Sequence, residues 1–397
     1  MAKLVEITGK ALSGEWGTDD ETGDGIPILR TTNFTNEGVV DYKDVVTRTI
    51  TKKNIDEKYL RSGDIIIEKS GGSDKQPVGR VIYFDGPEKT YLFNNFTGLL
   101  RVKNQEAWFP KYVFYSLYGN YRRGGTRPFE NKTTGLHNLK TDDYVSRYEV
   151  AETDYKKQVE VCEHLDRLYN VIKLREEEIQ KLDDLIKARF VELFGDPVAN
   201  PMGWDTDTCK NLTSKIGSGA TPKGGRESYG TEGISLIRSM NVYNNRFEYK
   251  DLAHITDEQA EKLDNVTIKE NDVLLNITGA SVARCCIVPK DLLPARVNQH
   301  VSIIRCKERL LPEFVACMFT EDNYQRLLWN IATAGGATRE AITKQQIEDL
   351  VLIVPPVEKQ QEFMNFAHQV HKSKVEIQQA LEKTQLLFDS LMQQYFG

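Results

Sequence analysis

The hydrophobic pattern of the chain is dominated by a stretch from about Asp154 to Phe194. Apolar residues recur there at steps of three and four, the spacing that places side chains on one face of a helix. These apolar positions are Cys162, Leu165, Tyr169, Ile172, Ile179, Leu182, Ile186, Phe190 and Leu193. Charged residues fill the positions between them, and neither Gly nor Pro interrupts the stretch. The pattern predicts one long helix, ~40 residues and roughly 60 Å, that acts as a spacer and buries a narrow seam against another helix.

A matching helix is predicted at the end of the chain, after Pro355 and Pro356. Its seam consists of Phe363, Phe366, Val370, Ile377, Leu381, Phe388, Leu391 and Tyr395. The ends of the two stretches also correspond at one constant offset, since Lys157-Gln158 matches Lys359-Gln360 and Phe194-Gly195 matches Phe396-Gly397. Two unrelated amphipathic helices are the alternative, but they would not be expected to share both ends and register. We therefore expect two copies that pair as an antiparallel coiled coil, because the second helix must return the chain.

Short apolar runs bounded by Gly and Asp precede the first helix. They lie at 26–29, 65–67, 81–84 and 99–102, and they predict the strands of a mixed or antiparallel domain. A helical piece is expected at about 111–121.

The same plan returns after the linker GDPVANPMGW, which starts at Gly195. GIPILRTTN from Gly25 is echoed by GISLIRSMN from Gly233, GDIIIEKSGG from Gly63 by NDVLLNITGA from Asn271, and FNNFTGLLRVK from Phe93 by VNQHVSIIRCK from Val297. Echoes in a preserved order indicate a duplicated unit of domain plus helix. The predicted fold class is α+β, with two β-rich domains joined by two long antiparallel coiled-coil helices in an internal pseudo-twofold repeat. The expected boundaries are domain 1–150, helix 151–197, domain 198–354 and helix 355–397.

Composition narrows the class of protein. A chain of 397 residues with 40% hydrophobic residues can form more than one core. No apolar run is long enough to span a membrane, and the N-terminus lacks a signal-peptide core. Six cysteines without a CxxC pair favour free thiols and a cytoplasmic location. The net charge of -6 argues against a uniformly basic nucleic-acid binder but leaves room for local basic surfaces.

Catalytic signals are weak, and no catalytic or metal-binding residue is predicted. The chain lacks both a phosphate-binding loop ending in Gly-Lys-Ser/Thr and the glycine-rich cofactor turn of a methyltransferase. Asp64 and Glu68-Lys69 come nearest to a nuclease site, but the Lys directly follows the Glu, so the two side chains would point to opposite faces of a strand. A surface turn that closes a buried strand is the simpler interpretation. His368 and His371, three apart on the last helix, are expected to be a solvated or seam pair rather than metal ligands.

Signals for DNA binding are stronger. Base edges are read by side chains with hydrogen-bond donors and acceptors, and glycines let the backbone approach a phosphate. Such residues cluster at matching places in both halves, although a plain turn explains any single cluster. In the first half the candidates are Arg30, Thr31, Thr32, Asn33, Lys69, Ser70, Ser73, Lys75, Gln76, Arg80, Asn94, Asn95, Arg122, Arg123, Arg127 and Lys132. In the second half they are Thr221, Lys223, Arg226, Arg238, Asn241, Thr278, Ser281, Arg284, Asn298, Gln299, Thr338 and Arg339.

The whole chain resembles the specificity (S) subunit of type I restriction-modification enzymes. The resemblance rests on the order of domains and helices and on particular stretches. These are GIPILRTTNF, EKSGGSDKQPVGRV, LFGDPVANPMGW, IGSGATPKGG and PPVEKQQEF. It implies that each domain is a target recognition domain reading one half of a bipartite DNA target. It also implies that the chain lacks a catalytic centre and docks two modification subunits, which carry the methyltransferase and its S-adenosylmethionine. In that family, restriction subunits join the complex. The chain departs from some members because it has no obvious short tandem repeat in the helices.

Sequence-specific recognition of double-stranded DNA is therefore the predicted function, with no cofactor bound by this chain. Two other classes stay open. A nuclease with an unrecognised site would cleave plasmid in the presence of Mg²⁺. A structural spacer that joins two protein partners would leave the assembled complex unable to retain DNA at low salt.

Overall fold

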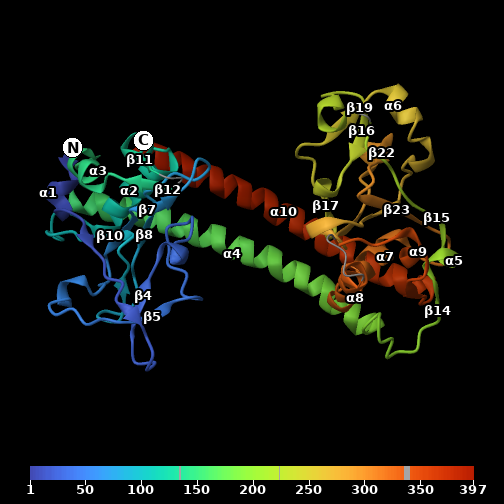
Figure 1. The fold of residues 1–397 in the computed structure, drawn as a ribbon, viewed down its shortest axis with the longest axis horizontal. Coiled ribbons are helices and arrows are strands. Elements are labelled where there is room, and N and C mark those ends of the chain that lie inside the picture. Colours follow the sequence, from blue (N-terminus) through green and yellow to red (C-terminus); the bar gives the residue numbers. More distant parts are fainter. Residues whose placement is uncertain (134–135, 223, 335–339) are drawn as a thin grey trace. The chain divides into compact units, whose positions relative to one another are not determined.

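The computed structural model describes residues 1–133, 136–222, 224–334 and 340–397. The chain divides into two compact units. Unit 1 comprises Met1–Glu176 and Gln379–Gly397, and unit 2 comprises Glu177–Gln378. The helices α4 (Tyr155–Phe194) and α10 (Val357–Phe396) contribute to both units, so each unit contains part of both (Figure 1). Both long helices predicted from the apolar periodicity are therefore confirmed.

Unit 1 is built on short strands and a few helices. The strands are β1 Ala2–Lys3, β2 Leu12–Ser13, β3 Thr18–Asp19, β4 Ile26–Leu29, β5 Val46–Thr49, β6 Ile65–Glu68, β7 Ser70–Gly72, β8 Val81–Tyr83, β9 Leu92–Phe93, β10 Thr97–Leu100, β11 Glu130–Thr133, β12 Leu136–Leu139 and β13 Glu149–Val150. The helices preceding α4 are α1 Leu4–Thr8, α2 Pro110–Arg122 and α3 Thr141–Arg147. The predicted strands thus occur within two residues of their expected bounds, and so does the helical piece.

A central antiparallel sheet in the order β2-β10-β6-β8 divides unit 1 into two cores. Strand β6 is buried on both faces. Ile65 and Ile67 join the cluster formed with α2 and the two long helices, whereas Ile66 joins the cluster that contains Leu29 and Phe93. A second sheet, β3-β5-β4-β9, includes the parallel pair β4 and β9. The uninterrupted apolar run of β6 follows from this burial on both sides.

Unit 2 repeats this topology. Its strands are β14 Thr206–Thr208, β15 Thr213–Ser218, β16 Ile234–Ile237, β17 Val242–Tyr243, β18 Arg246–Phe247, β19 Ala253–Ile255, β20 Val273–Asn276, β21 Cys285–Ile287, β22 Ala295–Val297, β23 Val301–Cys306 and β24 Val351–Ile353. Its shorter helices are α5 Cys209–Leu212, α6 Asp257–Glu261, α7 Pro312–Phe319, α8 Asp322–Thr333 and α9 Lys344–Glu348. The sheet order β15-β23-β20-β21 corresponds to β2-β10-β6-β8, and the parallel pair β16 and β22 corresponds to β4 and β9. The predicted duplication is confirmed.

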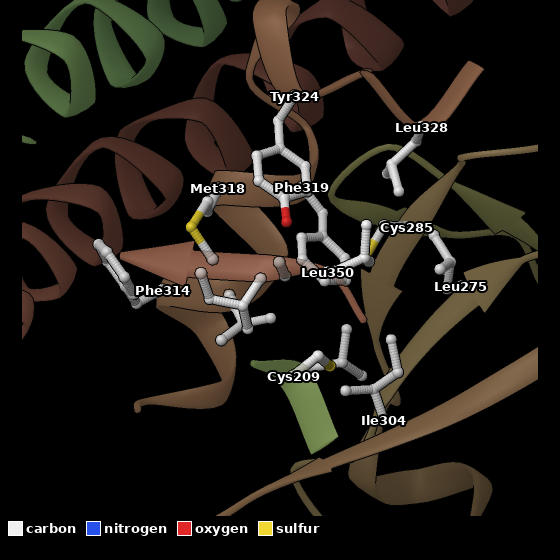
Figure 2. Packing of buried hydrophobic residues seen from close by; sticks show 14 of the residues in the cluster. Cys209, Leu275, Cys285, Ile304, Phe314, Met318, Phe319, Tyr324, Leu328 and Leu350 are labelled. Atoms are coloured by element: carbon white, nitrogen blue, oxygen red, sulfur yellow. The ribbon is translucent and has the colours of Figure 1, made fainter. Parts of the chain in front are cut away.

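The larger core of unit 2 lies between its central sheet and the helices α7 and α8 (Figure 2). Phe319 stacks on Tyr324, with ring centroids 5.2 Å apart. Side chains from several elements complete this core, among them Cys209, Leu275, Cys285 and Ile304 (Figure 2). Close packing of large apolar side chains favours one arrangement of helices on the sheet.

The long helices pair in an antiparallel sense within each unit. In unit 1, Arg175 of α4 donates from Nη1 to the carbonyl oxygen of Ala380 at 2.6 Å. In unit 2, Lys374 of α10 contacts Asp183 at 2.6 Å, and Phe190 meets Phe363 with centroids 5.4 Å apart. Residue numbers along α4 rise as those along α10 fall, which confirms the antiparallel seam.

A buried glutamine attaches each long helix to its own domain. Gln158 Oε1 accepts a hydrogen bond from Phe109 N at 2.8 Å, and its Nε2 donates to Ala107 O at 3.0 Å. Gln360 makes the equivalent bonds to Leu311 N at 2.9 Å and to Arg309 O at 3.0 Å. No helix within the described ranges is long and apolar enough to cross a membrane.

Candidate nucleic-acid interface

Three loops of unit 1 converge beside the ends of β4, β6 and β9. Asn94 N donates to Leu29 O at 3.0 Å, which joins the loop after β9 to the loop after β4. Lys69 N donates to Phe96 O at 2.8 Å, which joins the tip of the loop after β9, residues 94–96, to the connection between β6 and β7. Strand β12 then pairs with β7, with His137 opposite Gly72. We call residues 30–33, 69–72, 94–96 and 136–139 the first loop cluster.

Unit 2 builds the same arrangement with equivalent backbone bonds. Asn298 N donates to Ile237 O at 3.0 Å, and Ile277 N donates to His300 O at 3.0 Å. Gly279 N donates to Glu340 O at 2.9 Å, and this bond brings the segment that starts at Glu340 beside the loop after β20. Residues 238–241, 277–281, 298–300 and 340–341 form the second loop cluster. Each cluster thus gathers predicted DNA-binding residues from sites far apart in the sequence.

Asn33 and Asn241 brace these loops from inside. Asn33 Oδ1 accepts from Arg30 N at 2.9 Å, and its Nδ2 donates to Asp41 O at 2.9 Å. Asn241 repeats this with Arg238 N at 3.1 Å and Glu248 O at 2.9 Å. Both asparagines are buried. Their prediction as DNA contacts is therefore corrected, since a buried amide with its own partners is not available to a base.

Asn94 and Asn298 are also buried, at equivalent positions in the two tips. Asn298 Oδ1 accepts from His300 N at 3.0 Å, which holds the turn. Asn298 therefore acts within the protein, and burial keeps the side chain of Asn94 from the surface, so the assignment of both as DNA contacts is corrected. The next residue in each tip, Asn95 or Gln299, is exposed and stays a candidate.

Arg80 lies under the first loop cluster rather than on its surface. Its Nη1 and Nη2 donate to Phe34 O and Thr31 O, both at 2.9 Å, and Nη2 also contacts Glu68 at 3.2 Å. In unit 2 the same two carbonyl positions are bonded by Asn276, whose Nδ2 donates to Ser239 O at 2.8 Å and Val242 O at 3.4 Å. The prediction of Arg80 as a DNA contact is corrected for this reason.

The acidic residues considered for a nuclease site are internal. A turn at 62–63 precedes the buried strand β6, as expected, and Asp64 and Glu68 themselves are buried and paired with Arg101 and Arg80. Burial raises the pKa of the Glu68 carboxyl, and the nearby Arg80 opposes that rise. Because both carboxylates are paired with arginines, Asp64 and Glu68 do not offer a free carboxylate pair to a metal ion. Within the described ranges no group of three or more His, Cys, Asp or Glu could hold a metal ion.

The last-helix histidines were expected to be a solvated or seam pair. Burial, together with the nearby Lys374, lowers the pKa of His371. His371 therefore favours the neutral form, which suits a partly buried position on α10.

A hollow of unit 1 is lined by four of the basic candidates. Lys75, Arg122, Arg123 and Arg127 line it together with Asn36 and Gln76. Arg122 pairs with Asp389 at 2.8 Å, and Arg123 donates from Nη2 to Phe396 O. Both side chains stay exposed while they also bind α10. Such a concentration of cations suits a phosphate group.

In unit 2 the side chain of Arg284 stacks on an aromatic ring. Its guanidinium lies 4.5 Å from the centre of the Tyr243 ring, and Arg246 lies 4.7 Å from the same ring. Sequence reasoning did not identify Tyr243, because a lone tyrosine in a hairpin carries no spacing signal. Stacking fixes the plane of a guanidinium and leaves its N–H groups directed outward.

The remaining candidates lie in or beside these clusters. Lys69 Nζ donates to Ser13 Oγ at 2.9 Å, and burial lowers its pKa. Exposed candidates are Thr32, Ser73, Lys75, Gln76, Asn95, Arg122, Arg123, Arg127 and Gln299, and half-buried ones are Arg30, Thr31, Ser70, Thr221, Arg238, Thr278, Ser281 and Arg284. Lys223, Thr338 and Arg339 lie outside the described residues, and the side chains of Lys132 and Arg226 are likewise not described.

Comparisons with known proteins agree with this architecture. Residues 201–386 match the family described as the type I restriction modification DNA specificity domain. A solved chain from work on complex assembly and conformational transition of the type I R-M system is similar, with 16% identity, a TM-score of 0.57, and coverage of 100% of this chain and 96% of that chain. The type I restriction-modification S subunit from M. genitalium is also similar, with 12% identity, a TM-score of 0.57, and coverage of 100% and 95%. No curated protein matches the sequence.

Three findings agree with one another. They are the family match over residues 201–386, the repetition of the same topology in unit 1, and the fold shared with solved chains over the full length. Residues 201–386 match the type I restriction modification DNA specificity domain, and the whole chain shares its fold with solved chains of the type I restriction-modification system. The chain's two β-rich domains and two long helices give it the fold of the solved S subunit.

Proposed function

We propose that this chain selects the DNA target of a type I restriction-modification complex, with unit 1 reading one half of a bipartite sequence and unit 2 the other. The observation that carries the proposal is the pair of equivalent loop clusters. Their backbone bonds match one another, whereas the exposed side chains differ. Two similar scaffolds with different surfaces suit two half-sites of different sequence.

The proposal includes no chemical step on this chain. The acids nearest to a nuclease arrangement are engaged with arginines. Methyl transfer is assigned to two modification subunits that dock on the chain and bind S-adenosylmethionine, with restriction subunits joining that complex. We place the complex in the cytoplasm, in keeping with free thiols, four of them buried.

The test is reconstitution with the modification subunit of the same system. Genomic DNA lacking methylation is treated with the complex and S-adenosylmethionine, and the methylated positions are sequenced. We expect one asymmetric bipartite motif with an unspecified gap, and no motif when this chain is left out. Methylation at unrelated sites in the presence of the chain would contradict the proposal.

A parallel reaction addresses the nuclease alternative. The purified chain alone is incubated with supercoiled plasmid and Mg²⁺, and the plasmid is expected to stay intact. Cleavage that persists through repeated purification and is lost in a Glu68→Gln variant would favour an enzyme instead.

A further inference from the structure

The tip of the second loop cluster holds an exposed glutamine in one orientation. Gln299 Oε1 accepts a hydrogen bond from the hydroxyl of Thr221. On its other side, Gln299 Nε2 lies 3.1 Å from His300 Nε2. An amide nitrogen can only donate, so His300 Nε2 must be the acceptor in this contact. With the amide in this orientation each of its two polar atoms has one partner, and the side chain is braced from both sides.

The histidine is fixed in turn. Because its Nε2 accepts, the proton of the neutral ring is on Nδ1, which lies 2.6 Å from Thr278 Oγ1 and donates to it. Main-chain bonds hold the same residue, since His300 N donates to Asn298 Oδ1 at 3.0 Å and His300 O accepts from Ile277 N. The chain Thr278–His300–Gln299–Thr221 thus links three loops of unit 2 into one hydrogen-bonded relay.

The bracing leaves the outer edge of the amide open. Gln299 is exposed, and its second N–H and second oxygen lone pair have no partner among the described residues. An edge with one donor beside one acceptor matches adenine in the major groove, where N7 accepts and N6 donates. The other bases do not present this pair in that order, because guanine offers two acceptors there.

The equivalent tip of unit 1 carries different chemistry. Asn95 stands where Gln299 stands in unit 2, but its neighbour is Phe96, which is 53% exposed and offers no ring nitrogen. The backbone of the two tips is nevertheless the same, since Phe96 O accepts from Lys69 N as His300 O does from Ile277 N. The prearranged amide edge is thus a property of the second loop cluster.

We infer that Gln299, held by Thr221 and His300, reads one adenine in the half-site recognised by unit 2, with Nε2 donating to N7 and Oε1 accepting from N6. Gln299 is the specificity-determining residue, and Thr221 and His300 are positioning residues. The inference rests on the proposed function and deepens it, because it names the base that one side chain selects.

The test uses the reconstituted complex and duplexes that carry its own methylated motif. Each adenine of the unit 2 half-site is replaced in turn by 7-deazaadenine, which has a C–H in place of N7. Affinity is measured by fluorescence anisotropy for the wild-type complex and for Gln299→Ala. Gln345→Ala, an exposed glutamine on α9, is the matched control.

At one adenine the analogue, which leaves the Nε2 donor without its acceptor, should weaken wild-type binding roughly 5- to 150-fold. Gln299→Ala, which removes both hydrogen bonds, should bind the natural duplex with at least as large a loss and show no further loss with the analogue. Thr221→Val and His300→Phe should give intermediate losses that are confined to the same adenine. Gln345→Ala should behave as wild type.

Two results would overturn the inference while leaving the proposed function standing. One is a wild-type complex that is indifferent to 7-deazaadenine at every position of that half-site. The other is a Gln299→Ala complex that loses as much affinity with the analogue as the wild type does. Absence of any sequence-specific binding by the wild type would instead overturn the proposed function and, with it, the inference.

Discussion

Arg101 holds Asp64 through two parallel hydrogen bonds, from Nε to Oδ1 at 2.7 Å and from Nη2 to Oδ2 at 2.6 Å. Arg305 and Asp272 form the same pair in unit 2, with both bonds at 2.7 Å. Asp64 and Asp272 are 1% and 0% exposed. Each pair joins the start of a central strand to the end of its neighbour, so it sets the register of the sheet from which the loop cluster extends.

Removing one member of such a pair should be costly. We expect Arg305→Met to reduce the free energy of unfolding by about 3–5 kcal/mol, because the Asp272 charge would stay buried without its partner. Urea unfolding followed by circular dichroism measures the loss. Arg167→Met, which removes an exposed i,i+4 pair with Glu163, is the control and should change stability by less than about 1 kcal/mol. Equal effects of the two changes would contradict the assigned role of Arg305.

The glutamines at the start of the long helices give a second comparison. Gln360 is buried and bonds Leu311 N, Arg309 O and Pro355 O, whereas its neighbour Gln361 is exposed. Gln360→Ala should destabilise the chain by about 3 kcal/mol or more, since buried backbone groups lose their partners. Gln361→Ala should change little. Thermal unfolding of both variants measures the difference. A larger drop in Tm for Gln361→Ala than for Gln360→Ala would contradict the role of Gln360 in attaching α10 to its domain.

The stability of unit 1 should depend on pH through Glu68. Burial raises the pKa of this carboxyl above its ordinary value. The stability that such a group contributes is fully present below its unfolded pKa of about 4.3 and is lost as pH rises through the folded pKa. Glutamine does not titrate. Glu68→Gln should therefore gain stability relative to wild type as pH increases from about 4 to 8. Urea titrations across that range test the sign, and a relative loss with rising pH would show that Arg80 dominates.

The cysteines should be unreactive in the folded chain. Burial raises the pKa of the Cys209, Cys286, Cys306 and Cys317 thiols to about 12, and it also raises the pKa of Cys162 and Cys285. At pH 8 a thiol with a pKa of about 12 is ionised in only about one molecule in 10⁴. We expect slow labelling by a thiol reagent without denaturant and complete labelling after unfolding in guanidinium. Rapid labelling of the native chain would contradict this packing.

The periodic and repeated features of the chain were predictable from the sequence. A helix of 40 residues imposes its spacing on many positions at once, and α4 and α10 therefore followed from the apolar pattern. The duplication followed from the echoes, because each echo holds several residues in fixed order. These signals are local or repeated, so no knowledge of distant contacts was needed.

Side-chain roles within the candidate site were less predictable. Asn33 and Asn95 are both polar and lie in loops, yet one is buried and the other exposed. The difference arises from carbonyl groups such as Asp41 O, which only the folded loop brings to Asn33. Identity between the two repeats is a further signal in the sequence. Residues that are identical in both repeats, although the loops differ, are expected to have a role in the scaffold. Three such pairs are Asp64 and Asp272, Arg101 and Arg305, and Gln158 and Gln360.

Independent reading of two half-sites is tested most directly by sequencing the methylated motif of three reconstituted complexes: wild type, Asn95→Ala and Gln299→Ala. These two exposed amides stand at equivalent tips of the first and second loop clusters. We predict that Asn95→Ala relaxes sequence preference in one half of the motif only, that Gln299→Ala relaxes it in the other half only, and that the gap length stays the same. Loss of preference in the same half for both variants, or in both halves for either one, would contradict the account.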